Sequence, residues 1–305
     1  MKIGCVGMTT IDTLLFTDVL PQSHEGLSRV QSARTCIGGK GMVTALSAFM
    51  LGCDVSLLTM VGDREEVTSL LPADFSGKYF LETLQSNNRT WIPVSNDQST
   101  VTFIYSSPLR DFDRAEVFST VGEFVGSIEV LYISTEHTFL IKEAALAASR
   151  LSVPLVSNLN TPLICDLEDL AGAMPKLLVD VSHTIIMNEA ESEQALAKLN
   201  LRGWTEVTSP CLQEIIITQA SRGGVFAVRP FTKWVRYEAQ PVKETVCTVG
   251  AGDTFNGAYL KSRFIEKSSI LGSCENAARA AGMKVCLPSS SLCIEGMASG
   301  NEITK

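Results

Sequence analysis

The chain has 305 residues, with 25 basic and 33 acidic side chains and a formal net charge of −8 at pH 7. Hydrophobic residues make up 45% of the sequence and charged residues 19%, which excludes a largely disordered chain. An acidic chain lacks the clustered Lys and Arg side chains that nucleic acids require, so we expect no nucleic-acid partner. At about 150 residues per domain the length suggests two domains. Large α/β folds often form one unit of this size, and we expect a single domain over residues 1–305.

The nine cysteines and three histidines are scattered, which argues against a zinc site. The cysteines are odd in number and form no Cys-x-x-Cys pair, so we expect buried or half-buried free thiols in a reducing compartment. No apolar run approaches the about 20 residues that a membrane helix needs, so we expect no membrane partner. Thr9, Thr10 and Asp12 interrupt the apolar first residues, which indicate a strand rather than a signal peptide. The cytoplasm is therefore the expected location.

The first half of the chain predicts two buried strands, one helix and two regions of exposed strand. Residues 2–8 and Val55–Val61 are short apolar runs, typical of central strands. Residues 11–34 mix short apolar stretches with Asp, Pro, Gly and Ser, which favours exposed strands and turns rather than core. A helix is expected from the glycines at 38–41 to about Leu51, because apolar side chains recur there at helical spacing. The remaining segments are a mixed region at 64–88, half-exposed antiparallel strands at 90–93 and 100–106, and a loop at 107–119.

From residue 130 onward, predicted strands and helices alternate regularly. The strands are expected at 130–134, 154–157, 184–187, 214–218 and 224–228. The helices are expected at 139–151, 166–180, 189–200, 251–267 and 274–286. This alternation predicts an α/β fold with a mostly parallel central sheet covered by helices on both faces. Residues 11–35 and 90–106 do not fit the alternation and predict a small separate sheet.

The strongest local signal is the segment 248–255, in which three small residues at 250–252 precede an acid. The small residues let the backbone approach a ligand closely, and the residues after them predict a helix. A helix start offers unpaired N–H groups and a positive dipole end, which together can bind an anion. Asp253 either caps this helix or presents a carboxylate beside the anion. The glycines at 38–41 stand at a second predicted helix start, which suggests two adjoining ligands.

These two glycine clusters do not match the common nucleotide-binding loops. The first lacks Walker A spacing, because Met42 follows Gly-Lys-Gly, and no G-x-G-x-x-G follows the first strand. Gly38-Gly39-Lys40-Gly41 together with Gly250-Ala251-Gly252-Asp253-Thr254-Phe255 instead resembles the ribokinase/PfkB family of carbohydrate and nucleoside kinases, over essentially the whole chain. The resemblance implies a three-layer α/β/α ribokinase-like core and a β-sheet lid from about residues 11–35 and 90–106. ATP and a sugar would meet at the edge of the central sheet.

The resemblance assigns the chemistry of phosphoryl transfer to the late motif. Asp253 corresponds to the base that takes the proton from the acceptor hydroxyl. Gly250, Ala251 and Gly252 would hold the transferring phosphoryl group with their amides. Phosphoryl transfer depends on positioning and on neutralised charge, which such a site supplies.

The same resemblance implies a metal and a nucleotide site. Asn188 and Glu191 are similar to the Asn-x-x-Glu element that organises Mg²⁺ and phosphate, although the same spacing is that of an ordinary helix capping box. The ATP contacts that it implies are Thr218, Ser221, Gly223 and Asn276. The segment containing the first three of these also fits a plain β-turn.

On the acceptor side, the resemblance implies four residues. Asp12 would bind two sugar hydroxyls, and Gly39 and Lys40 would contact the same sugar. Glu136 matches another sugar-side position, and it also fits an exposed loop acid. Exposed lid strands often pair with a second copy, so a homodimer is expected.

Three positions depart from the family pattern. Val43 stands where an Asn is usual, which removes a polar sugar contact and argues against free ribose. Cys247 stands where potassium-activated members carry Asp, which makes a monovalent-cation site doubtful. Ala220 replaces the usual glycine of the nucleotide turn and would crowd the phosphates slightly.

The leading hypothesis is an ATP-dependent, Mg²⁺-requiring kinase that phosphorylates a hydroxymethyl group of a sugar or nucleoside-like substrate. One alternative is a sugar-phosphate kinase of the same fold, for which Arg29, Arg34 and Arg89 would supply cations. An alternative of another class is a non-catalytic ligand-binding or regulatory homologue. The three departures favour it, and the intact Asp253 with its small neighbours opposes it.

Overall fold

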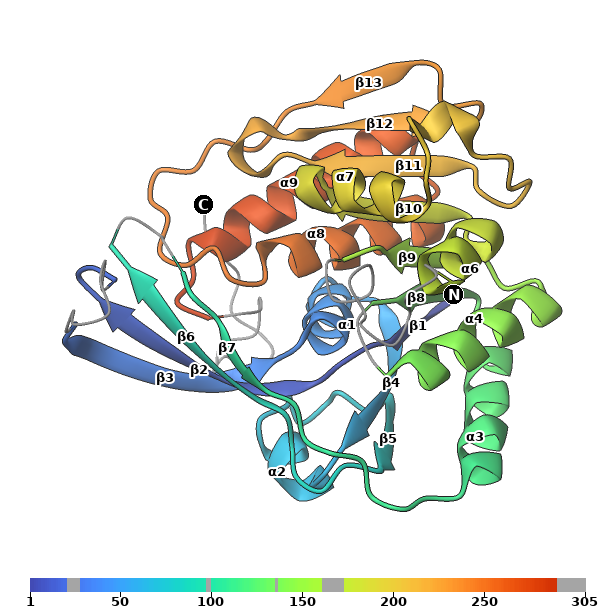
Figure 1. Ribbon diagram of the computed structural model, residues 1–305. Coiled ribbons are helices and arrows are strands. Elements are labelled where there is room, and N and C mark those ends of the chain that lie inside the picture. The colour runs from blue at the N-terminus through green and yellow to red at the C-terminus, as the bar shows by residue number, and fades with distance from the viewer. Residues whose placement is uncertain (21–27, 97–99, 135–136, 161–172, 290–305) are drawn as a thin grey trace.

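The computed structural model describes residues 1–20, 28–96, 100–134, 137–160 and 173–289 (Figure 1). Its centre is a nine-stranded sheet in which the strands from β11 to β5 run parallel, while β12 is antiparallel to both of its neighbours, β11 and β13. In sheet order the strands are β13 (Trp234–Tyr237), β12 (Gly224–Val228), β11 (Glu214–Thr218), β10 (Thr184–Asn188), β9 (Leu155–Asn158), β8 (Val130–Ile133), β1 (Lys2–Val6), β4 (Asp54–Val61) and β5 (Lys78–Glu82). The mostly parallel sheet predicted from the sequence is confirmed.

Helices cover both faces of this sheet, which gives the three expected layers (Figure 1). One face packs against α1 (Lys40–Met50), α8 (Ala251–Leu260) and α9 (Ile270–Val285). The other face packs against α3 (Arg114–Gly126), α4 (Thr138–Leu151), α6 (Ala173–Val181) and α7 (Glu189–Lys198). A short helix, α2 (Arg64–Ser69), follows β4, and a π-helical turn (Lys261–Ile265) continues α8. Within the described ranges, no helix is long and apolar enough to cross a membrane.

A second, four-stranded sheet joins the two sequence-distant pieces that the pattern set apart (Figure 1). Its strands are β3 (Val30–Gly38), β2 (Thr10–Thr17), β6 (Arg89–Ser95) and β7 (Phe103–Tyr105). β2 and β3 are antiparallel, as are β6 and β7, but β2 and β6 run parallel. We call it the small sheet below.

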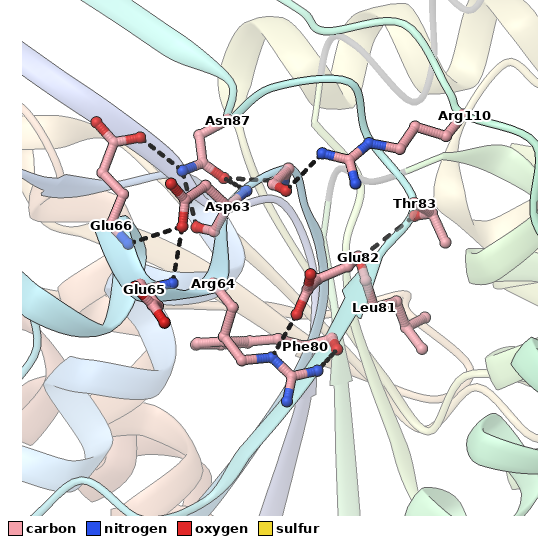
Figure 2. A network of polar contacts seen from close by, with 11 residues as sticks. Asp63, Arg64, Glu65, Glu66, Phe80, Leu81, Glu82, Thr83, Asn87 and Arg110 are labelled. Carbon is pink, nitrogen blue, oxygen red and sulfur yellow. Dashed lines mark hydrogen bonds and ion pairs between the residues drawn. The ribbon is translucent and has the colours of Figure 1, made fainter.

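A polar network fastens the chain that enters β6 to the start of α2 (Figure 2). The Asn87 side chain accepts hydrogen bonds from the backbone N–H groups of Gly62 and Asp63, at 2.9 and 3.0 Å. Its amide donates to the Glu66 carboxylate at 2.8 Å, and Arg110 donates to the Gly62 carbonyl at 2.8 Å. The small sheet is therefore anchored on the main sheet by directional hydrogen bonds.

Two sequence expectations in the first half were wrong. Residues 107–119 were expected to form a loop, but α3 begins at Arg114, where the Asp113 carboxylate accepts a hydrogen bond from Ala115 N at 2.8 Å. Polar residues on its outer face mask the buried stripe of Val117 and Val121. The strand β2 was expected to be exposed, but Leu14 is fully buried because the small sheet packs against the main body.

Smaller differences concern element bounds and cysteines. The sequence did not predict β5 or β13, and α9 begins four residues earlier than expected, where the Ser269 hydroxyl caps it. The first part of the helix expected at 166–180 lies outside the described residues, and α6 is its described part. The described cysteines are free, as predicted, but Cys211 and Cys286 are exposed.

Candidate active site

Close packing of α1 against α8 brings the two glycine-rich helix starts together. A Cβ on Gly257 would lie 2.7 Å from the Thr44 carbonyl oxygen, so this position holds the helices at backbone contact. The hydroxyl oxygens of Ser47 and Thr254 lie 3.2 Å apart between the same helices. Lys40 Nζ consequently lies 4.0 Å from Asp253 Oδ1.

Asp253 presents its carboxylate instead of capping α8. The residue at the N-cap position is Gly250, with φ of 78°, and no side chain caps this helix start. Within the described ranges no hydrogen bond reaches the Asp253 carboxylate, whose closest charged neighbour is Lys40. The side chain is 13% exposed, so it is largely sheltered from water while still reachable.

Burial raises the pKa of Asp253 above its ordinary value, since desolvation disfavours the charged form. The Lys40 ammonium opposes this shift, while the Glu191 and Asp12 carboxylates raise the pKa further. A weakly hydrated carboxylate with a raised pKa is a better proton acceptor than an exposed one.

The backbone at the start of α8 offers hydrogen-bond donors next to this carboxylate. The first helical bond runs from Thr254 N to the Gly250 carbonyl at 2.9 Å, and Ala251 N donates to Thr248 O at 3.2 Å. The N–H groups of Gly252 and Asp253 have no partner in the described part of the chain. A Cβ built on Gly252 meets nothing within 4 Å in the described part of the chain, so the side-chain position of Gly252 is open. An anion has access to two amides and the positive end of a helix dipole.

Asp12 lies buried on β2, at 4% exposure, where the small sheet meets the main body. Its Oδ1 accepts hydrogen bonds from the hydroxyls of Thr10, at 2.5 Å, and Thr90. Its carboxylate lies directly over Gly38, where a Cβ would be 1.8 Å from Oδ2. Asp12 and Asp253 are close enough to influence each other electrostatically. Glu136, expected beside them, lies outside the described residues.

Asn188 and Glu191 form the capping box that their spacing also allowed. Glu191 N donates to Asn188 Oδ1 at 2.8 Å, and Asn188 N donates to Glu191 Oε2 at 2.9 Å. Glu191 is buried, and its charge acts on Asp253, so it faces the same site. Among the described residues, no group of three or more His, Cys, Asp or Glu side chains could hold a metal ion by itself.

The predicted nucleotide turn follows β11 next to Asn188. Thr218 is the direct strand partner of Asn188, and Ser221 is exposed one turn further on. Gly223 has φ of 82°, and a Cβ there would lie 2.1 Å from the Tyr237 carbonyl oxygen, so β13 already explains this glycine. Ala220 adopts φ of 50°, a conformation that favours glycine.

Asn276 lies deeper along the helical layer than the other predicted contacts. Its amide donates to Ser262 Oγ at 3.0 Å, and Arg279 donates to its Oδ1 at 3.4 Å. Ser262 follows Asp253 by nine residues along α8 and the π-helical turn, about 14 Å at 1.5 Å per residue. The structure brings Asp12, Lys40, Glu191 and Asp253 together, and Asn276 stands apart from them.

Two side chains near the site were not singled out from the sequence. Asn256 donates to the hydroxyl of buried Tyr132 at 2.8 Å, directly behind the first turn of α8. Lys284, at the end of α9, is fully buried, and its charge acts on Asp253. A signal for Lys284 existed, because it continues the buried helical stripe of Cys274 and Ala277 at seven-residue spacing.

Comparison with known proteins places this arrangement in context. The model of the family described as pfkB family carbohydrate kinase matches residues 1–296. A nucleoside kinase of Methanocaldococcus jannaschii is 25% identical over 287 residues, covering 89% of this chain and 87% of the relative. A ribokinase of Dictyostelium discoideum is 23% identical over 306 residues, covering 93% and 94%.

Solved structures show the same fold. The ribokinase of Giardia lamblia superposes with a TM-score of 0.76 at 18% identity, covering 95% of each chain. A nucleoside kinase of Burkholderia thailandensis in complex with inosine gives a TM-score of 0.75 at 16% identity, covering 96% of this chain and 93% of that one. At such identities the likeness establishes the architecture.

Proposed function

The chain belongs to the pfkB family of carbohydrate kinases, as its glycine motifs indicated, and on that premise we propose that Asp253 is the general base of this kinase. It would take the proton from a hydroxymethyl group of a sugar or nucleoside while the γ-phosphate of ATP is transferred to that oxygen. The observation that carries this proposal is the sheltered Asp253 carboxylate, which caps nothing and lies 4.0 Å from Lys40. Its raised pKa suits proton acceptance.

The start of α8 would stabilise the phosphoryl group in transfer. The N–H groups of Gly252 and Asp253 have no partner among the described residues, and the helix dipole adds positive potential at this helix start. Lys40 lies beside the base, so its ammonium would neutralise phosphate charge as well as contact the acceptor. Gly250, with its left-handed φ, gives the turn that presents these amides.

The residues present fit a Mg²⁺ ion that keeps several bound waters better than one that is coordinated entirely by protein side chains. Mg²⁺ usually retains several waters and is held by one or two carboxylates together with substrate phosphates. Asn188 and Glu191 hold each other as a capping box, and the Glu191 carboxylate lies close enough to act on Asp253. We therefore propose that they hold Mg²⁺ through water, where the ion would shield charge on the phosphates of ATP.

The ATP contacts that we propose are the four residues that the sequence indicated. The structural support differs among them. Thr218 is the strand partner of Asn188, and Ser221 follows it by three residues, which supports ATP contacts on the side of the proposed Mg²⁺. Gly223 is explained by packing against β13, and Asn276 by its bond to Ser262. These last two therefore rest on the resemblance alone.

Asp12 is the proposed anchor of the acceptor. The hydroxyls of Thr10 and Thr90 fix the orientation of its carboxylate, which suits two neighbouring sugar hydroxyls. Gly38 lies directly beneath this carboxylate, and Gly39 and Lys40 follow it, so a sugar held by Asp12 would reach Lys40 and Asp253. Because ribose and nucleosides share that part of the molecule, both are candidate acceptors.

The small sheet is the proposed lid over the acceptor. Leu14, Ile92 and Val94 of its inner face form a buried cluster with Cys247, and Val249 packs against it. The lid therefore touches the loop that leads into α8. Exclusion of water at this contact would prevent hydrolysis of ATP.

The sugar-phosphate alternative is supported by one residue of the three that the sequence offered. The Arg89 guanidinium forms an ion pair with Glu66 Oε1 at 2.5 Å. Its charge is therefore already balanced by a carboxylate of the protein. Arg34 is the strand partner of Leu14 and therefore shares the inner face of the lid with Asp12. A phosphorylated acceptor would use this cation.

A phosphate-transfer panel tests these proposals. Purified protein is given Mg-ATP with nucleosides, free sugars and sugar phosphates, and ADP formation and phosphorylated product are measured. We expect turnover with nucleosides or sugars and a loss of kcat of about 10²–10⁴ in Asp253→Asn. Asp113→Asn is the matched control, because Asp113 also stands at a helix start and Asn preserves its cap. Turnover in Asp253→Asn within threefold of the unaltered protein would reject the base, and no turnover with any acceptor would favour the non-catalytic alternative.

We propose that a second copy of this chain covers the outer face of the lid. Trp91 and Phe103 are strand partners on that face, at 40% and 58% exposure, and Tyr105 adds 44% on the same face. Paired exposed aromatic side chains of this kind are typical of an interface. Mass measurement in solution distinguishes a dimer from a monomer.

A further inference from the structure

Lys284 is a buried cation at the base of the proposed active site. Its side chain is fully buried, and its Nζ donates to the carbonyl oxygen of Cys247 at 2.8 Å. In the described part of the chain no carboxylate lies within ion-pair distance of it. A buried ammonium without a direct counter-ion costs stability, and an apolar side chain of similar length would not. Its presence therefore calls for a role beyond packing.

The atom that Lys284 contacts belongs to the loop that enters α8. Val246 N and Cys247 N both donate to the Val285 carbonyl, at 2.7 and 3.0 Å, so the end of α9 holds this loop by its backbone. The Lys284 ammonium adds a third bond from the same turn. Three residues later the chain reaches Gly250, where the turn that exposes the amides begins. The side chain of Cys247 meanwhile packs under the lid.

The charge of Lys284 also reaches the reacting groups. Its ammonium lowers the pKa of Asp253, opposing the increase caused by burial, Glu191 and Asp12. Burial lowers the pKa of Lys284 itself, while the nearby Cys247, Cys36 and Asp253 favour its charged form. In a site sheltered from water, a fixed charge acts over longer distances than in solvent.

We propose that Lys284 is a positioning residue of this kinase, whose buried ammonium fixes the Cys247 carbonyl beneath the start of α8 and supplies positive charge to the phosphoryl site. The inference rests on the proposed function of Asp253 and of the α8 amides. Since the cation is built into the chain, turnover needs no monovalent metal ion to hold this loop.

The first experiment compares Lys284→Met with the unaltered protein. Methionine keeps most of the length and apolar volume and removes the charge. We expect kcat to fall at least tenfold, with KM values for ATP and acceptor changed less than threefold. The acid limb of the kcat profile should move to higher pH, because the group that lowers the pKa of Asp253 is lost. Lys198→Met is the matched control, since Lys198 also lies in the last turn of a helix, α7, away from the site.

A second experiment tests the cation directly. Lys284→Ala is assayed with added ammonium or methylammonium, and we expect at least a fivefold recovery of kcat. The unaltered protein is assayed in potassium, sodium and tetramethylammonium chloride, and we expect rates within twofold of one another. Even if both variants fail to fold, this ion series can overturn the proposal, because a built-in cation leaves no need for potassium.

Three results would overturn the proposal. They are a tenfold activation of the unaltered protein by potassium, an unchanged kcat and pH profile in Lys284→Met, or a folded Lys284→Ala variant that no cation restores. These outcomes leave the proposed function intact, because the unaltered protein still turns over. If it shows no turnover with any acceptor, the proposed function and the role of Lys284 fail together.

Discussion

The two glycine-rich helix starts look alike in sequence but differ in what surrounds them. At the start of α1, a Cβ on Gly41 would lie 2.4 Å from backbone atoms of Gly7, and one on Gly39 would lie 2.3 Å from the Met8 carbonyl oxygen. At the start of α8, a Cβ on Gly252 meets no atom of the described residues within 4 Å. The first start is closed by the protein itself, and the second opens onto free space.

This difference separates two uses of glycine. In the first cluster, the absence of side chains lets α1 pack against the end of β1, which holds Lys40 in place. In the second cluster, it leaves the side-chain position of Gly252 open next to two amides without a described partner. Substitutions at the first start should therefore lower stability, and substitutions at the second should lower activity.

The largest expected effect is that of Gly41→Ala. The added methyl group must displace the backbone of Gly7, so we expect a loss of about 3 kcal/mol in the free energy of unfolding. Denaturant unfolding measures it. Gly122→Ala in α3 is the matched control, because its Cβ meets nothing and alanine favours the helix. Equal stability in the two variants would show that the first start is not closed by packing.

Gly252→Ala should show the opposite behaviour. The methyl group enters the open space beside the proposed phosphoryl site, so we expect kcat/KM to fall about tenfold, about 1.4 kcal/mol in the barrier. Stability should stay level or rise, because alanine is a better helix former than glycine. Kinetics and thermal unfolding on the same preparation measure both. Full activity in this variant would contradict the assignment of this space to a ligand.

The pH dependence of kcat sharpens the contrast at Asp253. The base must be ionised, and its pKa is raised by burial, so activity should fall with decreasing pH through a midpoint above the ordinary aspartate value of about 3.9. Lys40 lowers this pKa, so Lys40→Met should move the midpoint to higher pH. The exposed Lys142 of α4 supplies the control, Lys142→Met. A midpoint that moves to lower pH in Lys40→Met would be incompatible with this electrostatic arrangement.

The smallest expected effect on stability is at Ala220, which stands where the nucleotide turn usually has a glycine. Ala220 has φ of 50°, and Ala220→Gly should relieve that strain and stabilise the protein by about 0.5–1 kcal/mol. The KM for ATP should change less than twofold, because the backbone already adopts this conformation. Ala197→Gly in α7 should instead destabilise by about 1 kcal/mol. Denaturant unfolding measures both changes in stability. Destabilisation in both variants would mean that the backbone of Ala220 is not strained.

Much of the architecture was predictable from local patterns. The β–α alternation after residue 130 predicted the mostly parallel sheet, and the two sequence pieces that did not fit it form the small sheet. The prediction failed for α3, whose outer face is polar, and for β2, whose burial depends on contact between the two sheets. Neither local composition nor periodicity reports such contacts.

The candidate site divides in the same way. The sequence pointed to Asp253, Lys40, Asp12 and Glu191, and the fold brings the last three within electrostatic reach of Asp253. It left open whether Asp253 capped its helix and whether Asn188 with Glu191 formed a capping box, because both readings require the same residues. Only the three-dimensional structure distinguishes these two interpretations.

The sequence by itself located the starts of α1, α7 and α8, since small residues and capping groups act on backbone atoms a few positions away. The tertiary structure alone decided what each helix start faces. Contacts between distant segments close the first start against Gly7 and leave the second open at Gly252. They also bury Lys284 beneath the loop that enters α8, because α9 packs beside α8 and its last turn lies against that loop.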